Sequence, residues 1–269
     1  MTINDFKKTI WAHYRRAGRT ALPWRRTRDP YAILVSEMML QQTQVARVGE
    51  YYEPFLKQFP SFRALARAKR SDVLKAWQGL GYNRRALFLQ RSAEIIVRQY
   101  GGRLPRDRAL LESLPGIGTG TSGSLMAFAF NKPEIFIETN IRRVFTHFFF
   151  QRRKRVTDAE LERCIGRSVD QKRAREWYWA LMDYGAAMKG THPRRRSAHD
   201  KRQPSFVGSD RELRGKIVRV ALSAEKQRIS AKELSAKLVV PRARLEKVLS
   251  ALGREGFIVR KGNHIYIQE

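Results

Sequence analysis

Two glutamates of this 269-residue chain stand where a carboxylate is unusual. Glu37 lies in SEMMLQQTQV, and the apolar residues around it on a predicted helix are Ile33, Leu34, Val35, Met38, Met39 and Leu40. A carboxylate in such surroundings is costly unless it is paired or protonated. A carboxyl group that keeps its proton near neutral pH is what a general acid needs. Glu37 is therefore a candidate for proton transfer, and a glutamate that reaches the surface from an incompletely buried helix is the alternative.

The second glutamate, Glu138, lies in FIETNIRRVF, after an apolar run and just before Asn140 and two arginines. It either closes a buried segment as a turn residue or is held at the edge of a site for chemistry. The stretch itself is compatible with both interpretations.

A glycine-rich turn, LPGIGTGTSG at residues 114–123, separates two predicted helices. Gly116 and Gly118 are expected to allow positive φ and to let a phosphate oxygen approach the backbone. The turn presents amide N–H groups at the start of the next helix, where the helix dipole favours an anion. The pattern is typical of a helix-hairpin-helix motif, which holds duplex DNA by its backbone; an ordinary glycine-rich connection is the alternative.

The charge of the whole chain supports a polyanionic partner. There are 54 Lys and Arg residues against 25 Asp and Glu, which gives a net charge of +29 and a pI near 11.1. Nucleic acid is the first candidate for this partner and an anionic membrane surface the second. Alternatively, the positive charge reflects a generally basic proteome or a thermophile's arginine-rich surface, and it then indicates no partner. No signal sequence and no apolar run of roughly 18 residues is found, so we expect a cytoplasmic protein.

Helical periodicity dominates residues 1–189 and predicts an all-α domain of about ten short helices, which would position both glutamates and the hairpin. Residues 190–211 are polar, basic and rich in turn formers, and they read as a linker. The linker histidines, His192 and His199, are expected to be solvated rather than zinc ligands, because they lack cysteine partners.

Residues 212–269 predict three helices followed by two short strands around a Gly-Asn turn, the pattern of a winged-helix domain. In that fold the third helix often enters the major groove of DNA, and its polar face here would carry Arg242, Arg244 and Lys247. A module for protein contacts is the alternative.

Several segments occur in an order that resembles a known family: WRRTRDPYAILVSEMMLQQTQVARV, GLGYNRRA, LPGIGTGTSG, IETNIRRVF and ALMDYGA. Together they resemble the endonuclease III superfamily of helix-hairpin-helix DNA glycosylases over about residues 6–189. LQQTQV and LPWRR most resemble its adenine DNA glycosylase (MutY-type) branch. The resemblance implies a mainly α, two-lobed fold that bends duplex DNA, flips a nucleotide and cuts its N-glycosidic bond.

The resemblance also implies roles for individual residues. Glu37 matches the general acid, and Glu138 matches an essential carboxylate, normally Asp, that faces the oxocarbenium ion. Asn140 and Arg142 are expected to buttress the turn at Glu138 and belong to the predicted DNA-binding residues, and Asp183 is expected to cap a helix. The DNA contacts are expected from Gln42, beside the displaced base pair, from Tyr82, which enters the base stack, and from the hairpin residues Leu114, Gly116, Gly118, Thr119 and Gly120.

Three departures from the family sharpen these expectations. Gly120 stands where the bifunctional lyases carry a nucleophilic lysine, so we expect a monofunctional glycosylase. Met188 stands where the first cysteine of an iron–sulfur cluster would be, and the only cysteine is Cys164, so we expect no cluster. Arg194, Arg195 and Arg196 follow in that segment, either as phosphate contacts or as a solvated charge run. The adenine branch usually carries a C-terminal Nudix-like domain, and we expect the short winged-helix unit in its place.

The sequence thus predicts a base-excision DNA glycosylase whose first candidate substrate is adenine opposite 8-oxoguanine or G. The alternatives are the same chemistry on a pyrimidine lesion (a uracil or thymine mismatch, or 5-hydroxyuracil) and a non-catalytic DNA-binding protein. We expect no metal and no cofactor, apart from a candidate monovalent cation site at the hairpin. The expected partner is double-stranded DNA with a damaged or mismatched base, bound by a nucleoid-associated monomer without membrane contact.

Overall fold

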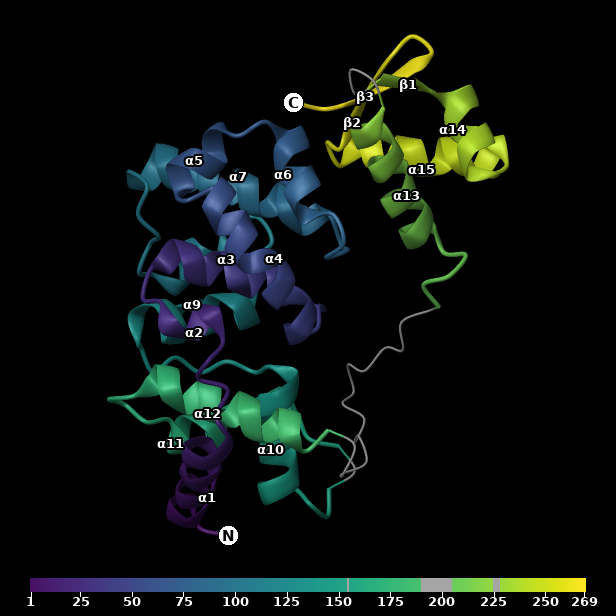
Figure 1. Cartoon of the computed structure of the whole chain (residues 1–269). Helices are drawn as coiled ribbons and strands as arrows, with labels where there is room; N and C mark the ends of the chain where they lie inside the picture. The colour runs from purple at the N-terminus through teal and green to yellow at the C-terminus, as the bar shows by residue number, and fades with distance from the viewer. Residues whose placement is uncertain (154, 190–204, 225–227) are drawn as a thin grey trace. The chain divides into compact units, whose positions relative to one another are not determined.

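The computed structural model of the chain describes residues 1–153, 155–189, 205–224 and 228–269 (Figure 1). The helices before residue 104 are α1 (Ile3–Ala17), α2 (Pro23–Arg26), α3 (Pro30–Leu40), α4 (Val45–Gln58), α5 (Phe62–Arg67), α6 (Arg70–Trp77) and α7 (Arg84–Tyr100). The next set is α8 (Arg108–Glu112), α9 (Thr119–Phe130), α10 (Thr139–Phe149), α11 (Asp158–Ser168) and α12 (Ala174–Ala187). None of the helices in the described residues is long and apolar enough to cross a membrane.

The chain forms two compact units, and each unit is built from two stretches that are far apart in the sequence. Met1–Glu37 and Leu104–Arg202 form unit 1, and Met38–Arg103 and Gln203–Glu269 form unit 2. The chain passes from unit 1 to unit 2 within α3, directly after Glu37.

In unit 1, α12 packs against α1, α9 and α10 (Figure 1). Large aromatic side chains fill the space between these helices, because α1 and α10 each direct an apolar face inward. The ring of Phe6 lies 5.1 Å from that of Phe145 and 5.9 Å from that of Trp177, centroid to centroid. These edge and tilted ring contacts form the core on which α9 and the start of α10 rest.

The predicted hairpin joins α8 to α9 in the same unit. Asp107 caps α8 by accepting a hydrogen bond from the Leu110 N–H at 2.9 Å. The Glu112 carboxylate then links the two helices, because it accepts from Arg108 Nε at 3.1 Å and from Ser122 Oγ at 2.7 Å. The turn between α8 and α9 is therefore held at both ends.

In unit 2, α7 packs against α5 and α6, and α4 packs against α6. Phe55 and Trp77 are buried at this junction with their ring centroids 5.8 Å apart. Helix α7 ends at Gly101, whose φ of 63° is the left-handed conformation that closes a helix without a steric penalty.

The C-terminal part of unit 2 contains α13 (Asp210–Ser223), β1 (Arg228–Ser230), α14 (Ala231–Leu238), α15 (Arg242–Arg254), β2 (Ile258–Lys261) and β3 (His264–Ile267). The three predicted helices and the hairpin around Gly262 are confirmed. The short strand β1 was not predicted; it pairs antiparallel with β3, and the sheet order is β1-β3-β2.

Part of the predicted linker lies outside the described residues, namely 190–204 with His192, His199 and the three arginines 194–196. The last two residues of the predicted linker, 210 and 211, belong to α13 instead, because Ser209 caps that helix by accepting a hydrogen bond from the Glu212 N–H.

Candidate active site

Glu37 occupies the position that its sequence predicts, on a helix whose other residues are mostly buried. Its neighbours on α3, Val35, Ser36, Met38 and Met39, are at most 1% exposed, whereas Glu37 itself keeps partial access to solvent. A residue on a buried helix that still reaches solvent has the placement required of a group that reacts with a bound ligand.

One hydroxyl group contacts the Glu37 carboxyl group directly. Ser124 Oγ lies 2.5 Å from Glu37 Oε2, and the same Oγ lies 3.0 Å from the carbonyl oxygen of Thr121, one turn earlier on α9. Ser124 is 3% exposed. The side chain is therefore fixed between the backbone of α9 and the carboxyl group of α3.

The surroundings of Glu37 hold its proton near neutral pH. Burial raises the pKa of Glu37 from 4.5 to about 7. The hydrogen bond from Ser124 and the charge of Arg25 oppose this rise, whereas the charge of Glu138 adds to it. A carboxyl group with such a pKa is protonated in a large fraction of molecules at physiological pH. It can therefore act as a general acid and, once ionised, as a base.

Glu138 is the N-cap of α10, so it has a structural role at the start of that helix. This role is compatible with a chemical role of the same carboxyl group. Its Oε2 accepts a hydrogen bond from the Asn140 N–H at 2.7 Å, and its Oε1 accepts from Asn140 Nδ2 at 3.4 Å. Burial raises the pKa of Glu138, while the amides of Asn140 and Ile141 and the charge of Arg143 oppose that rise. The dipole of α10 stabilises the ionised form at this position.

The buttress expected of Arg142 is made by its neighbour. Arg143 Nη1 donates to Asn140 Oδ1 at 2.7 Å and to the Gly185 carbonyl at 2.5 Å, whereas Arg142 pairs with Asp158 at 2.8 Å. Asn140 thus contacts Glu138 directly, and Arg143 rather than Arg142 contacts Asn140, while the DNA contacts expected of Asn140 and Arg142 stay predictions. A helix turns about 100° per residue, so adjacent arginines point in different directions from α10.

Gly185 explains why α12 can approach the Glu138 turn so closely. A Cβ atom at Gly185 would lie 2.5 Å from the Asn140 carbonyl oxygen and 2.7 Å from Asn140 Cβ. Any other residue type would push α12 away from the start of α10.

The hairpin has one glycine in the expected conformation and one that differs. Gly116 has a φ of 78°, as predicted, but Gly118 has a φ of −95° and forms the extended N-cap of α9. Thr119 and Gly120 open that helix, and their amides lie in its first turn, where intrahelical acceptors are missing. Leu114 is only 2% exposed, so its side chain anchors the turn.

The predicted DNA contacts of unit 2 lie in two tight loops. Gln42 and Tyr82 both have positive φ, of 57° and 47°, which is uncommon for residues other than glycine. Tyr82 is 39% exposed and follows Gly81, itself at a φ of 74°. Strained backbone at two residues expected to touch DNA is consistent with a functional constraint on both loops.

Arg85 holds these two loops, and the sequence analysis did not identify it. Arg85 Nη1 donates to the carbonyl oxygens of residues 38, 39 and 41, at 2.8, 2.7 and 2.6 Å. Arg85 Nη2 donates to Thr43 Oγ1 at 2.9 Å and to the carbonyl oxygens of residues 80 and 81 at 3.3 and 3.0 Å. The guanidinium thus caps the C-terminal carbonyls of α3 and fixes the residues on either side of Gln42 and the residue before Tyr82.

The two C-terminal arginines differ in exposure. Arg242, at the start of α15, is exposed. Arg244 is partly buried and makes contacts within its own module, with Asp210 Oδ1 at 3.0 Å and the Gly208 carbonyl at 2.6 Å. Arg242 therefore has the freer side chain for a partner.

Asp183 has a structural role, but not the helix cap that was expected. It lies inside α12 and accepts two hydrogen bonds from Arg25, at 2.6 and 2.9 Å, and two from Arg19, at 2.6 and 2.9 Å. This buried pairing joins α12 to α2, the helix whose arginine also faces Glu37.

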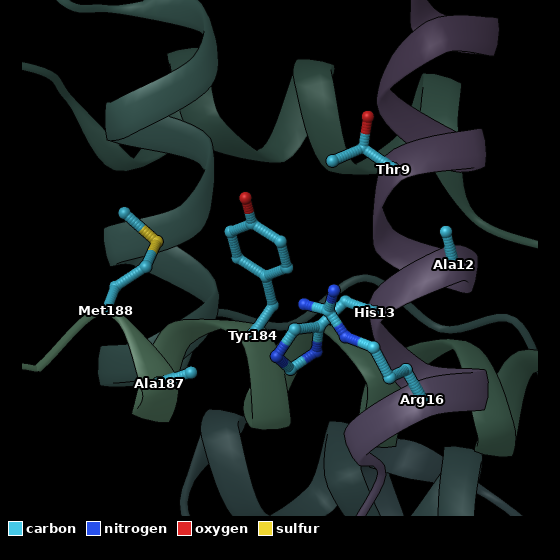
Figure 2. Close-up of a pocket in the computed structure, with 7 residues that line it drawn as sticks. All are labelled: Thr9, Ala12, His13, Arg16, Tyr184, Ala187 and Met188. Carbon is cyan, nitrogen blue, oxygen red and sulfur yellow. The ribbon is translucent and has the colours of Figure 1, made fainter.

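A cavity of about 750 Å³ lies between α1 and α12, and neither glutamate nor the hairpin contributes to its lining (Figure 2). It is lined by Thr9, Ala12, His13, Arg16, Tyr184, Ala187 and Met188. Met188 is the position at which the family resemblance places the first cluster ligand. An iron–sulfur cluster needs several thiolates, and the chain has one cysteine, so these residues do not fit that group.

Comparisons with known proteins identify the family. The family described as "HhH-GPD superfamily base excision DNA repair protein" matches residues 35–167. An adenine DNA glycosylase from Mycobacterium tuberculosis is 31% identical over 96% of this chain and 91% of its own length. A thymine/uracil-DNA glycosylase from Pyrobaculum aerophilum is 34% identical over 66% of this chain and 80% of its own length.

Relatives differ in how much of their length the chain covers. An adenine DNA glycosylase from Buchnera aphidicola is 33% identical, and the chain spans 53% of its length.

Solved structures agree with this assignment. A thermostable thymine-DNA glycosylase is similar over 71% of this chain and 88% of its own, with a TM-score of 0.64 and 29% identity. An endonuclease III in a non-covalent DNA complex shares the fold over 72% of this chain and 91% of its own, with a TM-score of 0.61 and 19% identity. The chain belongs to the HhH-GPD superfamily of base excision DNA repair proteins, the endonuclease III superfamily of DNA glycosylases that its sequence resembles.

Proposed function

We propose that this DNA glycosylase is monofunctional and excises adenine opposite 8-oxoguanine or G, with Glu37 as its general acid. The observation that carries the proposal is the state of Glu37, a partly exposed residue on a buried helix. Burial raises the pKa of its carboxyl group to about 7, and the charge of a second carboxyl group, that of Glu138, adds to this rise. A solvated surface glutamate would be ionised and could not donate a proton at this pH.

The proposed reaction uses Glu37 twice. As the N-glycosidic bond breaks, its electron pair leaves with the base, and the Glu37 carboxyl group gives that base a proton. The ionised Glu37 then takes a proton from a water molecule that attacks C1′ of the sugar. The products are the free base and an abasic site with a hydroxyl group on C1′, and Glu37 regains its proton.

Glu138 would stabilise the positive charge that develops on the sugar. Burial raises the pKa of its carboxyl group, and the first-turn amides of α10 that donate to it favour the ionised form. In that form, a fixed negative charge near an oxocarbenium ion lowers the barrier. The interaction between Glu138 and Glu37 supports roles of both groups in one site.

The preference for adenine rests on the relatives that match most of the chain. The relative from Mycobacterium tuberculosis, whose similarity covers 96% of this chain, is named an adenine DNA glycosylase. Gln42 lies in the LQQTQV segment that most resembles this branch, and its loop is the one that Arg85 holds.

A pyrimidine substrate is the second candidate. It is favoured by the thymine/uracil-DNA glycosylase relative at 34% identity and by the thymine-DNA glycosylase structure with a TM-score of 0.64. Glu138 in place of the usual Asp also favours a pocket adapted to a different base.

The monofunctional assignment rests on Gly120, which offers no amine for a Schiff base with the sugar. Duplex DNA would be held by the hairpin amides, by Gln42 and Tyr82, and by the C-terminal module, which we infer is a winged-helix domain whose α15 presents Arg242 to a groove. We expect a monomer on DNA and no iron–sulfur cluster.

The test is a panel of duplexes that each carry one lesion, incubated with protein and then heated in alkali to cleave abasic sites. We expect cleavage at adenine opposite 8-oxoguanine, a loss of at least about 100-fold in Glu37→Gln, and little change in Glu176→Gln, a surface carboxylate of the same unit paired with Arg28.

Each other outcome of the panel has a clear meaning. Cleavage only at pyrimidine lesions would replace the first substrate by the second. Cleavage without alkali would overturn the monofunctional assignment. Tight duplex binding without cleavage of any lesion would contradict glycosylase activity of the chain and favour a DNA-binding role.

A further inference from the structure

We propose that Ser124 is the positioning residue for Glu37, with a hydroxyl group that changes from hydrogen-bond donor to acceptor as Glu37 gains its proton. This inference rests on the proposed function, because it concerns the residue that would move the proton. It names a part of the site that none of the motifs in the sequence points to.

The Ser124 hydroxyl group has fewer protons than neighbouring oxygen atoms. Ser124 Oγ carries one hydrogen and has two oxygen neighbours, Glu37 Oε2 at 2.5 Å and the Thr121 carbonyl oxygen at 3.0 Å. When Glu37 is ionised, both neighbours accept hydrogen bonds, and the single Ser124 proton can satisfy only one of them.

Protonation of Glu37 removes this conflict. The Glu37 O–H donates to Ser124 Oγ, and the Ser124 O–H donates to the Thr121 carbonyl, so Ser124 Oγ is hydrogen-bonded to both neighbours at once. The ionised state instead takes the Ser124 proton away from Thr121. Both states keep a short contact between Oγ and Oε2, so the carboxyl group can stay in one place while its charge changes.

The serine side chain is well placed to act as a fixed support. Ser124 is buried in the interior of α9, and its bond to Thr121 links it to the first helical turn after the hairpin. A support on this helix ties the position of Glu37 to the motif expected to hold the DNA backbone.

Other charged groups that act on Glu37 come from two further elements. Glu138, the N-cap of α10, favours the protonated form of Glu37, and Arg25 of α2 favours the ionised form. Ser124 is the neutral contact among them. Because hydrogen bonds to ionised groups are roughly twice as strong as those between neutral groups, its net effect favours the ionised form.

Two measurements test the inference. The first is a ¹³C NMR titration of the Glu37 side-chain carboxyl carbon in the free protein, assigned by its absence in Glu37→Gln. In Ser124→Ala we expect the midpoint to rise by about one pH unit, because the bond to the ionised form is lost. Ser124→Cys keeps a weak donor of similar volume and should show a smaller rise.

The matched control is Ser36→Ala. Ser36 is the buried neighbour of Glu37 on α3, and its hydroxyl donates to the Ile33 carbonyl at 2.8 Å. Its removal deletes a buried hydroxyl from the same helix and should leave the midpoint of Glu37 unchanged.

The second measurement is the single-turnover rate of base release against pH. Ser124→Ala should move the high-pH limb upward by the same amount as the NMR midpoint and reduce the maximal rate by about tenfold, because the carboxyl group loses its support. Ser36→Ala should follow the wild-type profile.

The two readouts separate this inference from the proposed function. A shifted NMR midpoint supports the Ser124 contact even if no lesion is cleaved, in which case the proposed function alone fails. An unchanged or lowered midpoint in Ser124→Ala, or an equal rise in Ser36→Ala, would overturn the role of Ser124 even if the enzyme is active.

Discussion

The carboxylate of Glu138 accepts a hydrogen bond from the backbone N–H of Asn140 at 2.7 Å and so caps α10. A helix cap fixes the carboxylate in place, and the partial positive charge of the helix terminus favours its ionised form against the effect of burial, which raises its pKa. The same residue can therefore support the fold and face a developing positive charge.

Replacing Glu138 by Asp should separate these two roles. Aspartate is at least as good an N-cap, so we expect the free energy of unfolding to stay within about 0.5 kcal/mol of wild type. The shorter side chain moves the charge by about 1.5 Å, a displacement that can change rates by about 100-fold. If adenine is the substrate, Glu138→Asp should raise the rate of adenine release.

Urea unfolding measures the effect on stability, and single-turnover excision measures the effect on the rate. Asp158→Glu is the control, because it changes a surface carboxylate paired with Arg142 by one methylene. Unchanged stability with lost adenine excision would argue that the pocket is adapted to glutamate and to another base.

Ionisation of Glu37 is expected to lower the free energy of unfolding at high pH. Its pKa in the folded chain is about 7, against an ordinary value of 4.5. The stabilisation from the protonated group is complete below about pH 4.5 and is lost as the pH rises through about 7. Glu37→Gln cannot ionise, so it should match wild type near pH 4 and be more stable near pH 8 by about 1–3 kcal/mol.

Chemical unfolding at the two pH values provides this comparison, with Glu176→Gln as the control that should show no such crossover. Equal stability of Glu37→Gln and wild type at the higher pH would show that Glu37 is solvated as an ordinary carboxylate.

Arg85 should matter both for stability and for the distortion of DNA. Lysine cannot reproduce six hydrogen bonds that the two arms of the guanidinium make to two loops. We expect Arg85→Lys to lower the free energy of unfolding by about 2–4 kcal/mol and to weaken base displacement, followed by the fluorescence of 2-aminopurine in the duplex.

Arg84→Lys is the matched control, because Arg84 is the adjacent exposed residue of α7. It should change stability by less than about 0.5 kcal/mol. Base displacement that is unaffected in folded Arg85→Lys would remove the link between this arginine and the loops of Gln42 and Tyr82.

Much of this arrangement could be predicted from the sequence, because the signals are local. Glu37 is conspicuous in a run of apolar residues, and the LPGIG turn marks the junction of α8 and α9. The Pro-Arg start of α15 and the Gly-Asn turn between β2 and β3 likewise depend on neighbouring residues alone.

What could not be predicted depends on contacts between distant residues. Arg84 and Arg85 are identical in type, and only the packing of α7 decides which one is buried. On α10, likewise, only packing decides that Arg143 contacts Asn140 whereas Arg142 pairs with Asp158. Ser124 carried a weak signal, a hydroxyl in the apolar run SLMAFAF, but its partner lies 87 residues away in the chain.

Gly120 offers a test of the expected monofunctional chemistry. A Cβ atom there would make only an ordinary contact, 3.6 Å from the Ile137 carbonyl oxygen, so the backbone at this position accepts a side chain. Gly120→Lys should introduce an amine able to attack the sugar, giving a complex with substrate DNA that borohydride traps and strand cleavage without alkali.

Gly120→Arg is the control, because it adds a similar charge and length without a nucleophilic amine. Borohydride trapping by the wild-type protein itself would show that another amine already forms a Schiff base.

The pH dependence of base release tests the role of Glu37 most directly. Single-turnover rates on a duplex with adenine opposite 8-oxoguanine should be measured from about pH 5 to about pH 9 for wild type and Glu37→Gln. The wild-type rate should fall about tenfold per pH unit above about 7, where Glu37 loses its proton, and Glu37→Gln should be inactive throughout. A wild-type rate that stays level or rises above pH 7, or a Glu37→Gln variant that still releases the base, would contradict Glu37 as the general acid.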